Sequence, residues 1–364
     1  MKFNEFHFKS KPRINILLPE FGVLPMGGFK IAYTYANYLA HQGYEVNLIH
    51  AYTMDKICDL NKYISYLEAK VMIYFKPPNW FKLSKKINKK YTLLFNNYTV
   101  NNADITIATA WNTARDLNKL NTKKGRKLYF IQGYEVCFAP KKDVDETWKY
   151  DMKKIVVSRW LKAIGQKMEC NDLEYIPNAI NYKKFKINKK ISERANVISM
   201  MYSKSKLKGS KDGIAALKIL KNKFPDIEIL LFGVDERINE IPKWMKYFQN
   251  PSQETLINKV YNESSIFIST SYTEGWGLPP MEAMACGCAV VTTASGGVED
   301  FAIDNETALL CEAGNIDELV DKVGLLIENK EIRFNIAYKG NNYVQRFTWK
   351  ESFRSFNNVI KSLL

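Results

Sequence analysis

Short apolar runs alternate with longer amphipathic segments along the chain, and this alternation restricts the possible folds more than any other feature. Residues 13–19 have the pattern of a buried strand that ends at a proline, and a glycine-containing loop follows. A segment with helical spacing of apolar residues then leads into a second strand pattern at residues 44–50. Units of strand, helix and strand build parallel sheets. The sequence therefore predicts an α/β protein.

The alternation occurs in two successive series, which predicts two domains. The first series closes with a strand pattern at residues 173–176, and the second opens with strand patterns at 196–202 and 227–232. The stretch between them is polar and rich in lysine, as linkers often are. With 364 residues, we expect two doubly wound, Rossmann-like domains that face a cleft. Their predicted extents are residues 1–185 for the first domain, 186–195 for the linker, 196–345 for the second domain and 346–364 for a C-terminal helix.

The charge of the chain is unevenly distributed. Residues 1–190 contain 33 lysines and arginines against 16 acids, whereas residues 191–364 contain 20 against 22. Basic residues cluster at 82–90, 119–127 and 183–190. The asymmetry favours an anionic partner for the first half, which could be nucleic acid, a membrane surface or a phosphorylated acceptor. Lysine-rich solvated faces, which are common, are an equally good interpretation.

Several classes of protein are excluded by the composition. Hydrophobic residues make up 46% of the chain and aromatic residues 13%, enough for two cores, so wholesale disorder is excluded. No apolar run reaches the roughly 18–20 residues that a membrane span needs. The segment 1–13 is polar and basic, so we expect a cytoplasmic protein that can attach peripherally to the inner face of the membrane. The cysteines form no CxxC pair and predict neither a zinc site nor a disulfide framework; they are Cys58, Cys137, Cys170, Cys286, Cys288 and Cys311.

The most informative stretch is residues 269–291, which reads as a strand, a glycine loop, a helix and another strand. Open α/β sheets bind ligands at the carboxyl ends of their strands. A helix N-terminus at such an edge offers free backbone N–H groups and a favourable dipole to a phosphate group. Proline has no N–H to donate, and Pro279 and Pro280 open the predicted helix. The amides available for a phosphate are therefore those of Gly275, Trp276, Gly277 and Leu278.

Two carboxylates bracket this loop, Glu274 and Glu282. An acid next to a phosphate site is unfavourable unless it accepts hydrogen bonds from neutral hydroxyl groups. A nucleotide sugar supplies both chemistries, because it carries a diphosphate together with the hydroxyls of a ribose and of the transferred sugar. The alternative interpretations are that Glu282 is a first-turn acid that favours the helix dipole and that Glu274 is a solvated loop acid.

The segment Glu-Gly-Trp-Gly-Leu-Pro-Pro-Met-Glu at 274–282 resembles the E-x7-E signature of retaining glycosyltransferase family 4, which has the GT-B fold. Residues 295–300, 305–310 and 175–180 resemble further segments of that family. The resemblance is strong in the second half and loose in the first, where it points to bacterial enzymes of surface polysaccharide synthesis, including a rhamnosyltransferase-like branch. It implies a GT-B protein whose C-terminal helix packs back on the first domain.

The resemblance also implies roles for particular residues. Glu274 would bind hydroxyls of the transferred sugar, and Glu282 would bind the ribose hydroxyls. The family commonly uses an arginine followed by Lys-Gly; here Lys208 and the glycine after it match the second part, and Lys204 stands roughly where the arginine is expected. Lysine neutralises a diphosphate as a point charge but lacks the bidentate fork of arginine, and Lys206 could serve instead. The predicted catalytic set is Glu274, Lys204 and Lys208, and a solvated lysine-rich loop is the alternative.

Candidate residues in the first half are fewer. Gly27 and Gly28 would let a diphosphate or an acceptor approach the backbone, and the resemblance matches them to the family's N-terminal glycine loop. Some family members carry a histidine near the reacting sugar, but His7, His41 and His50 lie in no matching motif. In the equivalent region, Tyr134 and Glu135 follow a strand pattern and are candidates for the acceptor side.

These observations favour a retaining, metal-independent hexosyltransferase of cell-surface glycan synthesis. It would move a hexose or deoxyhexose from a nucleotide-diphosphate sugar to a saccharide or lipid-linked saccharide acceptor, with no cofactor beside that donor. A sugar-nucleotide epimerase or a phosphorylase on the same fold is one alternative. A basic nucleic-acid-binding protein is another, but the chain lacks a recognisable readout module and this function leaves the 274–282 loop unexplained. We therefore expect no nucleic-acid partner.

Overall fold

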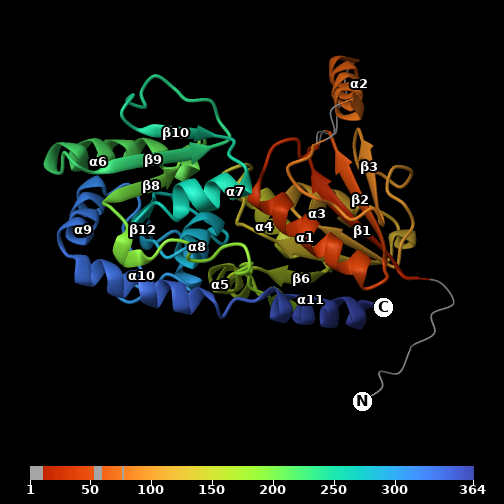
Figure 1. Ribbon diagram of the computed structural model, residues 1–364. Coiled ribbons are helices and arrows are strands. Elements are labelled where there is room, and N and C mark those ends of the chain that lie inside the picture. Colours follow the sequence, from red (N-terminus) through yellow and green to blue (C-terminus); the bar gives the residue numbers. More distant parts are fainter. Residues whose placement is uncertain (1–10, 53–59, 76–77) are drawn as a thin grey trace. The chain divides into compact units, whose positions relative to one another are not determined.

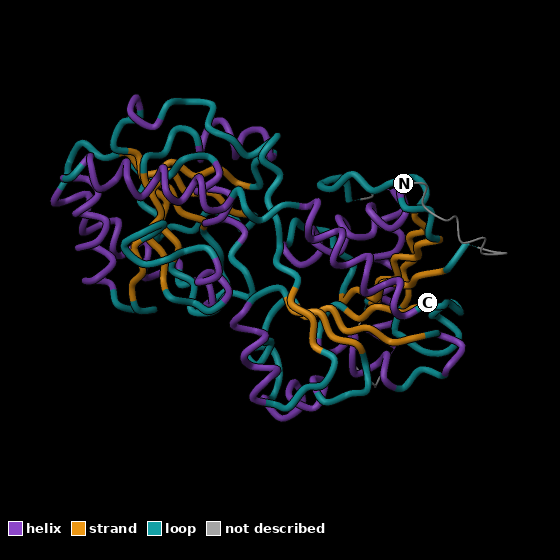
Figure 2. Tube along the Cα trace, turned by 90° about the horizontal axis from the view of Figure 1, so that it is seen from below, coloured by secondary structure: helices purple, strands orange, loops and turns teal. Residues whose placement is uncertain are grey.

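The computed structural model describes residues 11–52, 60–75 and 78–364, and the chain in it forms two compact units. The first unit comprises the described residues up to Val157 together with Leu161–Ile176 and Phe353–Leu364. The second comprises Ser158–Trp160 and Pro177–Ser352. Each unit contains one parallel sheet with helices packed around it (Figures 1 and 2). Two units of this kind, Rossmann-like in architecture, confirm the predicted fold class.

The sheet of the first unit has seven strands in the order β3-β2-β1-β4-β5-β6-β7, all paired in parallel. The chain builds outward from β1 to β3 and then returns to the other side of β1 with β4. The order of strands therefore reverses between β1 and β4, where open α/β sheets bind ligands. The strands are β1 (Arg13–Pro19), β2 (Glu45–Ala51), β3 (Ile87–Thr92), β4 (Ile105–Ala108), β5 (Arg126–Ile131), β6 (Lys153–Val156) and β7 (Leu173–Tyr175).

Helices cover this sheet, and the last helix of the chain is one of them. It begins after Thr348, whose hydroxyl caps the helix by accepting a hydrogen bond from the Glu351 amide at 3.1 Å. Phe353 stacks on Tyr38 with ring centroids 4.2 Å apart, so aromatic packing holds this helix on the first unit. The helices are α1 (Gly27–His41), α2 (Leu60–Phe75), α3 (Trp111–Asn118), η1 (Thr122–Lys124), α4 (Lys141–Trp148), α5 (Arg159–Lys167) and α11 (Trp349–Leu363).

The sheet of the second unit has six parallel strands in the order β10-β9-β8-β11-β12-β13. Here the order reverses between β8 and β11, so the loops that follow these two strands flank the expected ligand position. The strands are β8 (Val197–Met201), β9 (Glu228–Gly233), β10 (Lys246–Gln249), β11 (Ile266–Ser269), β12 (Ala289–Thr293) and β13 (Leu309–Cys311).

The core of the second unit lies between this sheet and the helices α6 and α9. Leu217 and Leu220 of α6 and Val323 and Leu326 of α9 are fully buried against apolar strand residues. The helices of this unit are η2 (Ile191–Glu193), η3 (Lys206–Lys208), α6 (Ser210–Lys223), α7 (Gln253–Thr255), the π-helical turn η4 (Leu256–Tyr261), α8 (Leu278–Ala285), η5 (Gly297–Asp300), α9 (Ile316–Glu328) and α10 (Lys330–Val344).

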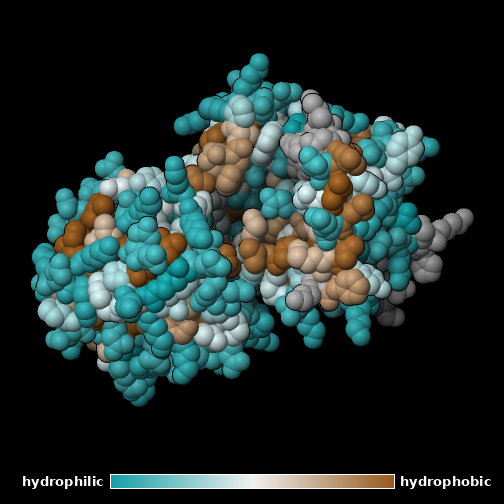
Figure 3. All heavy atoms as spheres, turned by 90° about the horizontal axis from the view of Figure 1, so that it is seen from above, coloured by the Kyte–Doolittle hydropathy of each residue, from teal (hydrophilic) through white to brown (hydrophobic). Residues whose placement is uncertain are grey.

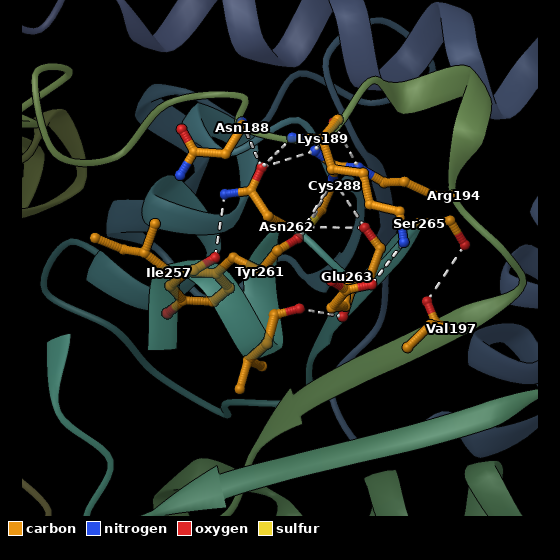
Figure 4. A network of polar contacts seen from close by, with 12 residues as sticks. Asn188, Lys189, Arg194, Val197, Ile257, Tyr261, Asn262, Glu263, Ser265 and Cys288 are labelled. Carbon is orange, nitrogen blue, oxygen red and sulfur yellow. Dashed lines mark hydrogen bonds and ion pairs between the residues drawn. The ribbon is translucent and has the colours of Figure 1, made fainter. Parts of the chain in front are cut away.

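The stretch predicted to be a linker, residues 186–195, lies within the segment Pro177–Ser352 of the second unit. Although this stretch is polar, its Arg194 is buried. The guanidinium of Arg194 donates hydrogen bonds to the carbonyl oxygens of Ser264 at 2.9 Å and Cys286 at 2.6 Å. Figure 4 shows this guanidinium among the polar groups of residues 257–265. Because arginine carries five donors, it can satisfy several carbonyl groups at once. Arg194 fixes the segment to the turn that follows α8.

Candidate active site

The loop between β11 and α8 has the arrangement that the sequence predicted. It ends at Gly277, whose φ of +93° lies in the left-handed region, and α8 begins at Leu278 with prolines as its second and third residues. The helix N-terminus therefore lies at the carboxyl edge of the second sheet, next to the position where the strand order reverses. A small cavity at this edge is lined by Met201, Lys208, Phe267, Ile268, Ser269, Thr270, Ser271, Glu274, Pro279 and Pro280.

An ion pair joins the two loops of this edge. The Nζ atom of Lys208 lies 2.6 Å from Oε1 of Glu274, and the Ser271 hydroxyl donates to the same oxygen at 2.7 Å. The Glu274 side chain is only 12% exposed and that of Lys208 is 29% exposed. Glu274 is therefore a partly buried, paired carboxylate, which disfavours its interpretation as a solvated loop acid. Ser271 is a contact that the sequence analysis did not identify.

The turn at Gly209 explains how Lys208 reaches this position. Gly209 has φ of +57°, and a Cβ atom added to it would lie 2.0 Å from the carbonyl oxygen of Thr270. The Thr270 hydroxyl in turn donates to the Lys208 carbonyl oxygen at 3.0 Å, and the Tyr272 amide donates to that of Leu207 at 2.8 Å. Only glycine permits this close approach of the two loops. The backbone conformation of this turn thus requires a glycine directly after Lys208.

Lys204 and Lys206 occupy a different environment from Lys208, because both are exposed. The backbone amide of Lys204 donates to the Asp235 carboxylate at 2.8 Å, and the Ser203 hydroxyl contacts the same oxygen at 3.2 Å. Asp235 follows β9 and was not identified from the sequence, since a single acid after a strand carries no distinctive pattern. It fixes the backbone of the 203–205 turn and leaves the choice between Lys204 and Lys206 open.

Glu282 lies on α8 and is 5% exposed. It is the fifth residue of the helix, because α8 begins at Leu278, so the interpretation of Glu282 as a first-turn acid is wrong. The hydroxyl of Tyr261 donates to its Oε2 atom at 3.2 Å. Tyr261 is fully buried, and this burial raises the pKa of its hydroxyl well above the usual value, with the charge of Glu282 acting in the same direction. Tyr261 is therefore a fixed, neutral donor to Glu282.

A second glycine loop holds the Glu274 backbone from the other side. The Glu274 amide donates to the Ser295 carbonyl oxygen at 2.8 Å, and the Gly297 amide donates to the Glu274 carbonyl oxygen at 2.9 Å. A Cβ atom at Gly297 would lie 2.1 Å from the Gly275 carbonyl oxygen. This contact gives the segment at 295–300, which the resemblance had singled out, a structural role beside the site.

The Trp276 side chain is part of the core and does not face the cavity. It is 3% exposed, its Nε1–H donates to the Met281 sulfur at 3.1 Å, and its ring packs against Phe301 and Phe347. The predicted donor contacts in the loop are thus backbone amides of Gly275, Trp276, Gly277 and Leu278. The indole of Trp276 instead fixes the loop against the body of the second unit.

The candidates of the first unit lie at the carboxyl edge of their own sheet. Gly27 and Gly28 are the first two residues of α1 and are exposed, and a Cβ atom on Gly28 would lie 3.6 Å from the amide of Gln132. The Tyr134 hydroxyl donates to Asp145 at 2.6 Å. Glu135 accepts a hydrogen bond from the Trp111 amide at 2.6 Å, at the start of α3. Burial raises the pKa of Glu135 to about 7.

Other candidate chemistry is sparse in the described residues. His50 is fully buried, contacts the Tyr33 hydroxyl at 3.2 Å and the Glu20 carbonyl oxygen at 2.8 Å, and burial lowers its pKa to about 3. His7 and Cys58 lie outside the described residues. Among the residues that the structure describes, no group of three histidine, cysteine or acidic side chains could hold a metal ion. None of the described helices is long and apolar enough to cross a membrane.

Comparison with known proteins connects this geometry to a family. Residues 181–343, which include the cavity, the ion pair and α8, match the family model described as "Glycosyl transferases group 1". The match lies within the second unit and covers 163 of the 364 residues of the chain. The matched segment includes all the residues predicted to contact the donor except Gly27 and Gly28.

Similar proteins are consistent with this match. The capsular polysaccharide biosynthesis glycosyltransferase CapM of Staphylococcus aureus is 27% identical over 205 residues, which are 50% of this chain and 54% of CapM. The match thus spans about half the length of that relative. Sucrose-phosphate synthase from Thermosynechococcus elongatus has a similar structure, with 16% identity, coverage of 97% of this chain and 99% of the other, and a TM-score of 0.73. HepE of Anabaena in complex with UDP-glucose gives 14% identity, coverage of 97% and 100%, and a TM-score of 0.72. These neighbours have the GT-B fold, as predicted.

Proposed function

We propose that the protein is a retaining glycosyltransferase that moves a hexose or deoxyhexose from a nucleotide-diphosphate sugar to a saccharide or lipid-linked saccharide acceptor. The observation that carries the proposal is the contact between Lys208 and Glu274 in the cavity beside the N-terminus of α8. A cation, backbone amides and a carboxylate meet there, which suits a diphosphate and a hydroxyl-rich sugar. The match of residues 181–343 to the group 1 family model supports the reaction class, and the UDP-glucose complex of HepE supports the donor class.

The positive groups of the site would act on the leaving diphosphate. Lys208, together with Lys204 or Lys206, and the amides of the 275–278 loop would stabilise the negative charge that grows as the bond to the sugar breaks. Donors fixed in advance do this without reorganisation at the moment of reaction. These groups supply the charge that a metal ion supplies elsewhere, so the proposed reaction is metal-independent.

The two carboxylates would bind neutral hydroxyls. Glu274 would accept a hydrogen bond from the transferred sugar when Lys208 turns from it towards a diphosphate oxygen. Glu282, which accepts a hydrogen bond from Tyr261, would also accept one from a ribose hydroxyl. Because both carboxylates are largely buried, each hydrogen bond from the donor would be formed away from bulk water, where it gives orientation as well as affinity.

Retention at the anomeric carbon would follow if the acceptor enters on the face that the diphosphate leaves. The leaving phosphate oxygen can take the proton of the acceptor hydroxyl, so the bond from carbon to the acceptor oxygen forms as the bond to phosphate breaks. No protein base is needed for this step. We propose that Tyr134 and Glu135 belong to the acceptor side, and that the acceptor is a growing cell-surface glycan, which the resemblance to CapM supports.

The test is a panel of UDP-, GDP-, dTDP- and ADP-sugars, each incubated with and without oligosaccharide acceptors. We expect one donor to release its nucleoside diphosphate in an acceptor-dependent manner, and proton NMR of the product to show the anomeric configuration of the donor. Lys208→Ala and Glu282→Ala should lower this rate by about 10²-fold or more. Conversion of a donor sugar in the absence of any acceptor would indicate an epimerase instead. Near-normal rates in both variants would contradict the proposal.

A further inference from the structure

Helix α2 of the first unit exposes an unusual number of large apolar side chains. Those of Leu60, Tyr63, Ile64, Leu67, Val71, Met72, Tyr74 and Phe75 are between 41% and 82% exposed. In Figure 1 this helix projects from the unit, and Figure 3, viewed from that side, shows apolar atoms gathered on the same face of the unit. Exposed patches of this kind mark sites of interaction with a partner or a membrane.

The exposed apolar residues occupy the face of α2 that points away from the protein. The helix packs on the first unit through Tyr66 and Ile73, which form a buried cluster with Phe21. At 100° per residue, Leu60, Leu67 and Val71 lie within about 40° of one another and about 130° around the helix from Tyr66 and Ile73. Two faces of α2 are therefore apolar, and the fold of the unit covers only one of them.

A neighbouring loop extends the apolar surface. Phe21, whose ring centroid lies 6.1 Å from that of Tyr66, leads into a loop in which Val23, Leu24 and Met26 are 44%, 53% and 52% exposed. The outward face of α2 and this loop together are called the α2 patch below. It belongs to the first unit alone and contains none of the residues assigned to the donor.

The charge of α2 and of the segment that follows it indicates what covers the α2 patch. From Leu60 to Thr92 the sequence carries eight lysines and a single acid, Glu68, and the exposed Lys70 lies on α2 itself. The first half of the chain has the same bias, with 33 basic residues against 16 acids up to residue 190. Amphipathic helices that lie in a bilayer interface combine an apolar face with lysines and with aromatic residues, here Tyr63, Tyr74 and Phe75.

We propose that the α2 patch docks the first unit on an anionic lipid surface, with the outward face of α2 lying in the headgroup region and Lys70 contacting the headgroups. The inference does not depend on the proposed transfer reaction. A second copy of the chain is the competing occupant, because Leu60, Ile64, Leu67, Val71 and Tyr74 have the 4-3-4-3 spacing of a coiled-coil seam. That seam spans only two heptads, and pairing would bring two strongly basic units together, so charge favours the lipid.

The experiment is co-sedimentation of the full chain with vesicles, without donor or acceptor. One set contains equal parts of phosphatidylcholine and phosphatidylglycerol, and the other contains phosphatidylcholine alone. The variant Leu67→Glu/Val71→Glu changes two exposed residues and should remain folded. Leu325→Glu is the matched control, since Leu325 is 42% exposed on α9 of the second unit. The variant Lys70→Gln tests the contribution of charge, because Lys70 is exposed on α2 itself.

We expect wild type and Leu325→Glu to sediment with the anionic vesicles and to stay in the supernatant with the neutral ones. The double glutamate variant should bind the anionic vesicles at least about tenfold more weakly than wild type. The lysine variant should bind them several-fold more weakly, and its binding should depend less on salt concentration. Circular dichroism and nucleotide-induced thermal shifts should match wild type in every variant. The proposal would be overturned if wild type stayed in the supernatant with both kinds of vesicle, or if the double variant bound as well as wild type. It would also be overturned if wild type were a dimer and the double variant a monomer.

Discussion

Variants of the ion pair between Lys208 and Glu274 can distinguish its contribution to folding stability from its contribution to turnover. Lys208→Met removes the cation 2.6 Å from a carboxylate that is 12% exposed and leaves it the hydrogen bond from Ser271. Losing one partner of a fully buried pair costs about 3–5 kcal/mol. Lys208 is 29% exposed, so water will replace part of the contact. We therefore expect a loss of roughly 1–3 kcal/mol in the free energy of unfolding of the second unit.

The double variant Lys208→Met/Glu274→Gln carries the decisive comparison. It removes the unpaired charge, so stability should return to within about 1 kcal/mol of wild type. Turnover should not return, because the cation that stabilises the leaving diphosphate is still absent; a loss of about 10²–10³-fold is expected in both variants. Lys218→Met, at an exposed position of α6, is the control and should change stability by less than about 0.5 kcal/mol.

Urea unfolding followed by fluorescence and circular dichroism measures the first effect, and nucleotide release measures the second. Because the chain has two compact units, the unfolding curves are fitted with a separate transition for each unit. The reasoning would be refuted if Lys208→Met were as stable as wild type, since the ion pair would then contribute nothing to the fold. It would equally be refuted if the double variant recovered the turnover of wild type.

Three further changes have expected outcomes that standard measurements can check. Gly209→Ala should destabilise the second unit by more than about 2 kcal/mol in urea unfolding, because its Cβ atom would lie 2.0 Å from a carbonyl oxygen, whereas Gly43→Ala, with a left-handed φ and no atom within 4 Å, should cost about 1 kcal/mol. Tyr261→Phe should raise the KM for the donor several-fold with a small change in kcat, because the hydroxyl orients Glu282 and does not touch the reacting atoms. Burial raises the pKa of Glu135 from 4.5 to about 7, so the folded state favours the neutral form of this carboxyl group. The stability that it contributes is fully present below about pH 4.5 and is lost as the pH rises through about 7, a change of roughly 3 kcal/mol. Glu135→Gln should flatten this dependence in thermal unfolding measured against pH.

The central strands were predictable and the edge strands were not, for one physical reason. β1 and β11 are buried on both faces and read as continuous apolar runs, so the sequence located them within a few residues. β3 (Ile-Asn-Lys-Lys-Tyr-Thr) and β10 lie at the edges of their sheets and carry polar or charged residues, so neither shows an apolar run. α2 was missed as well, because apolar side chains occupy most of its circumference and blur its amphipathic period.

The site was predictable where the chemistry lies in one continuous segment. The glycine loop, the helix N-terminus and both acids were located from residues 274–282, and the structure places them at the edge of the sheet where the strand order reverses. The contacts of Glu274 with Lys208 and Glu282 with Tyr261 join residues 66 and 21 positions apart. Glu274 and Lys208 were predicted as separate site residues but not as a pair, and the contact of Glu282 with Tyr261 was not predicted. Tertiary packing brings these pairs together, and no local sequence pattern encodes it. Trp276 shows the converse, since its place in a binding motif gave no indication that its indole is buried.

The most direct test of the account is calorimetric titration of the nucleoside diphosphate selected by the donor panel, compared with its 2′,3′-dideoxy analogue. The central claim is that the second unit binds the diphosphate through Lys208 and loop amides, and the ribose through Glu282. Wild type should bind the ribonucleotide about tenfold or more tightly than the analogue, and Glu282→Gln should lose most of this difference while both ligands still bind. Equal affinity of wild type for the two ligands, or an undiminished preference in Glu282→Gln, would contradict this claim.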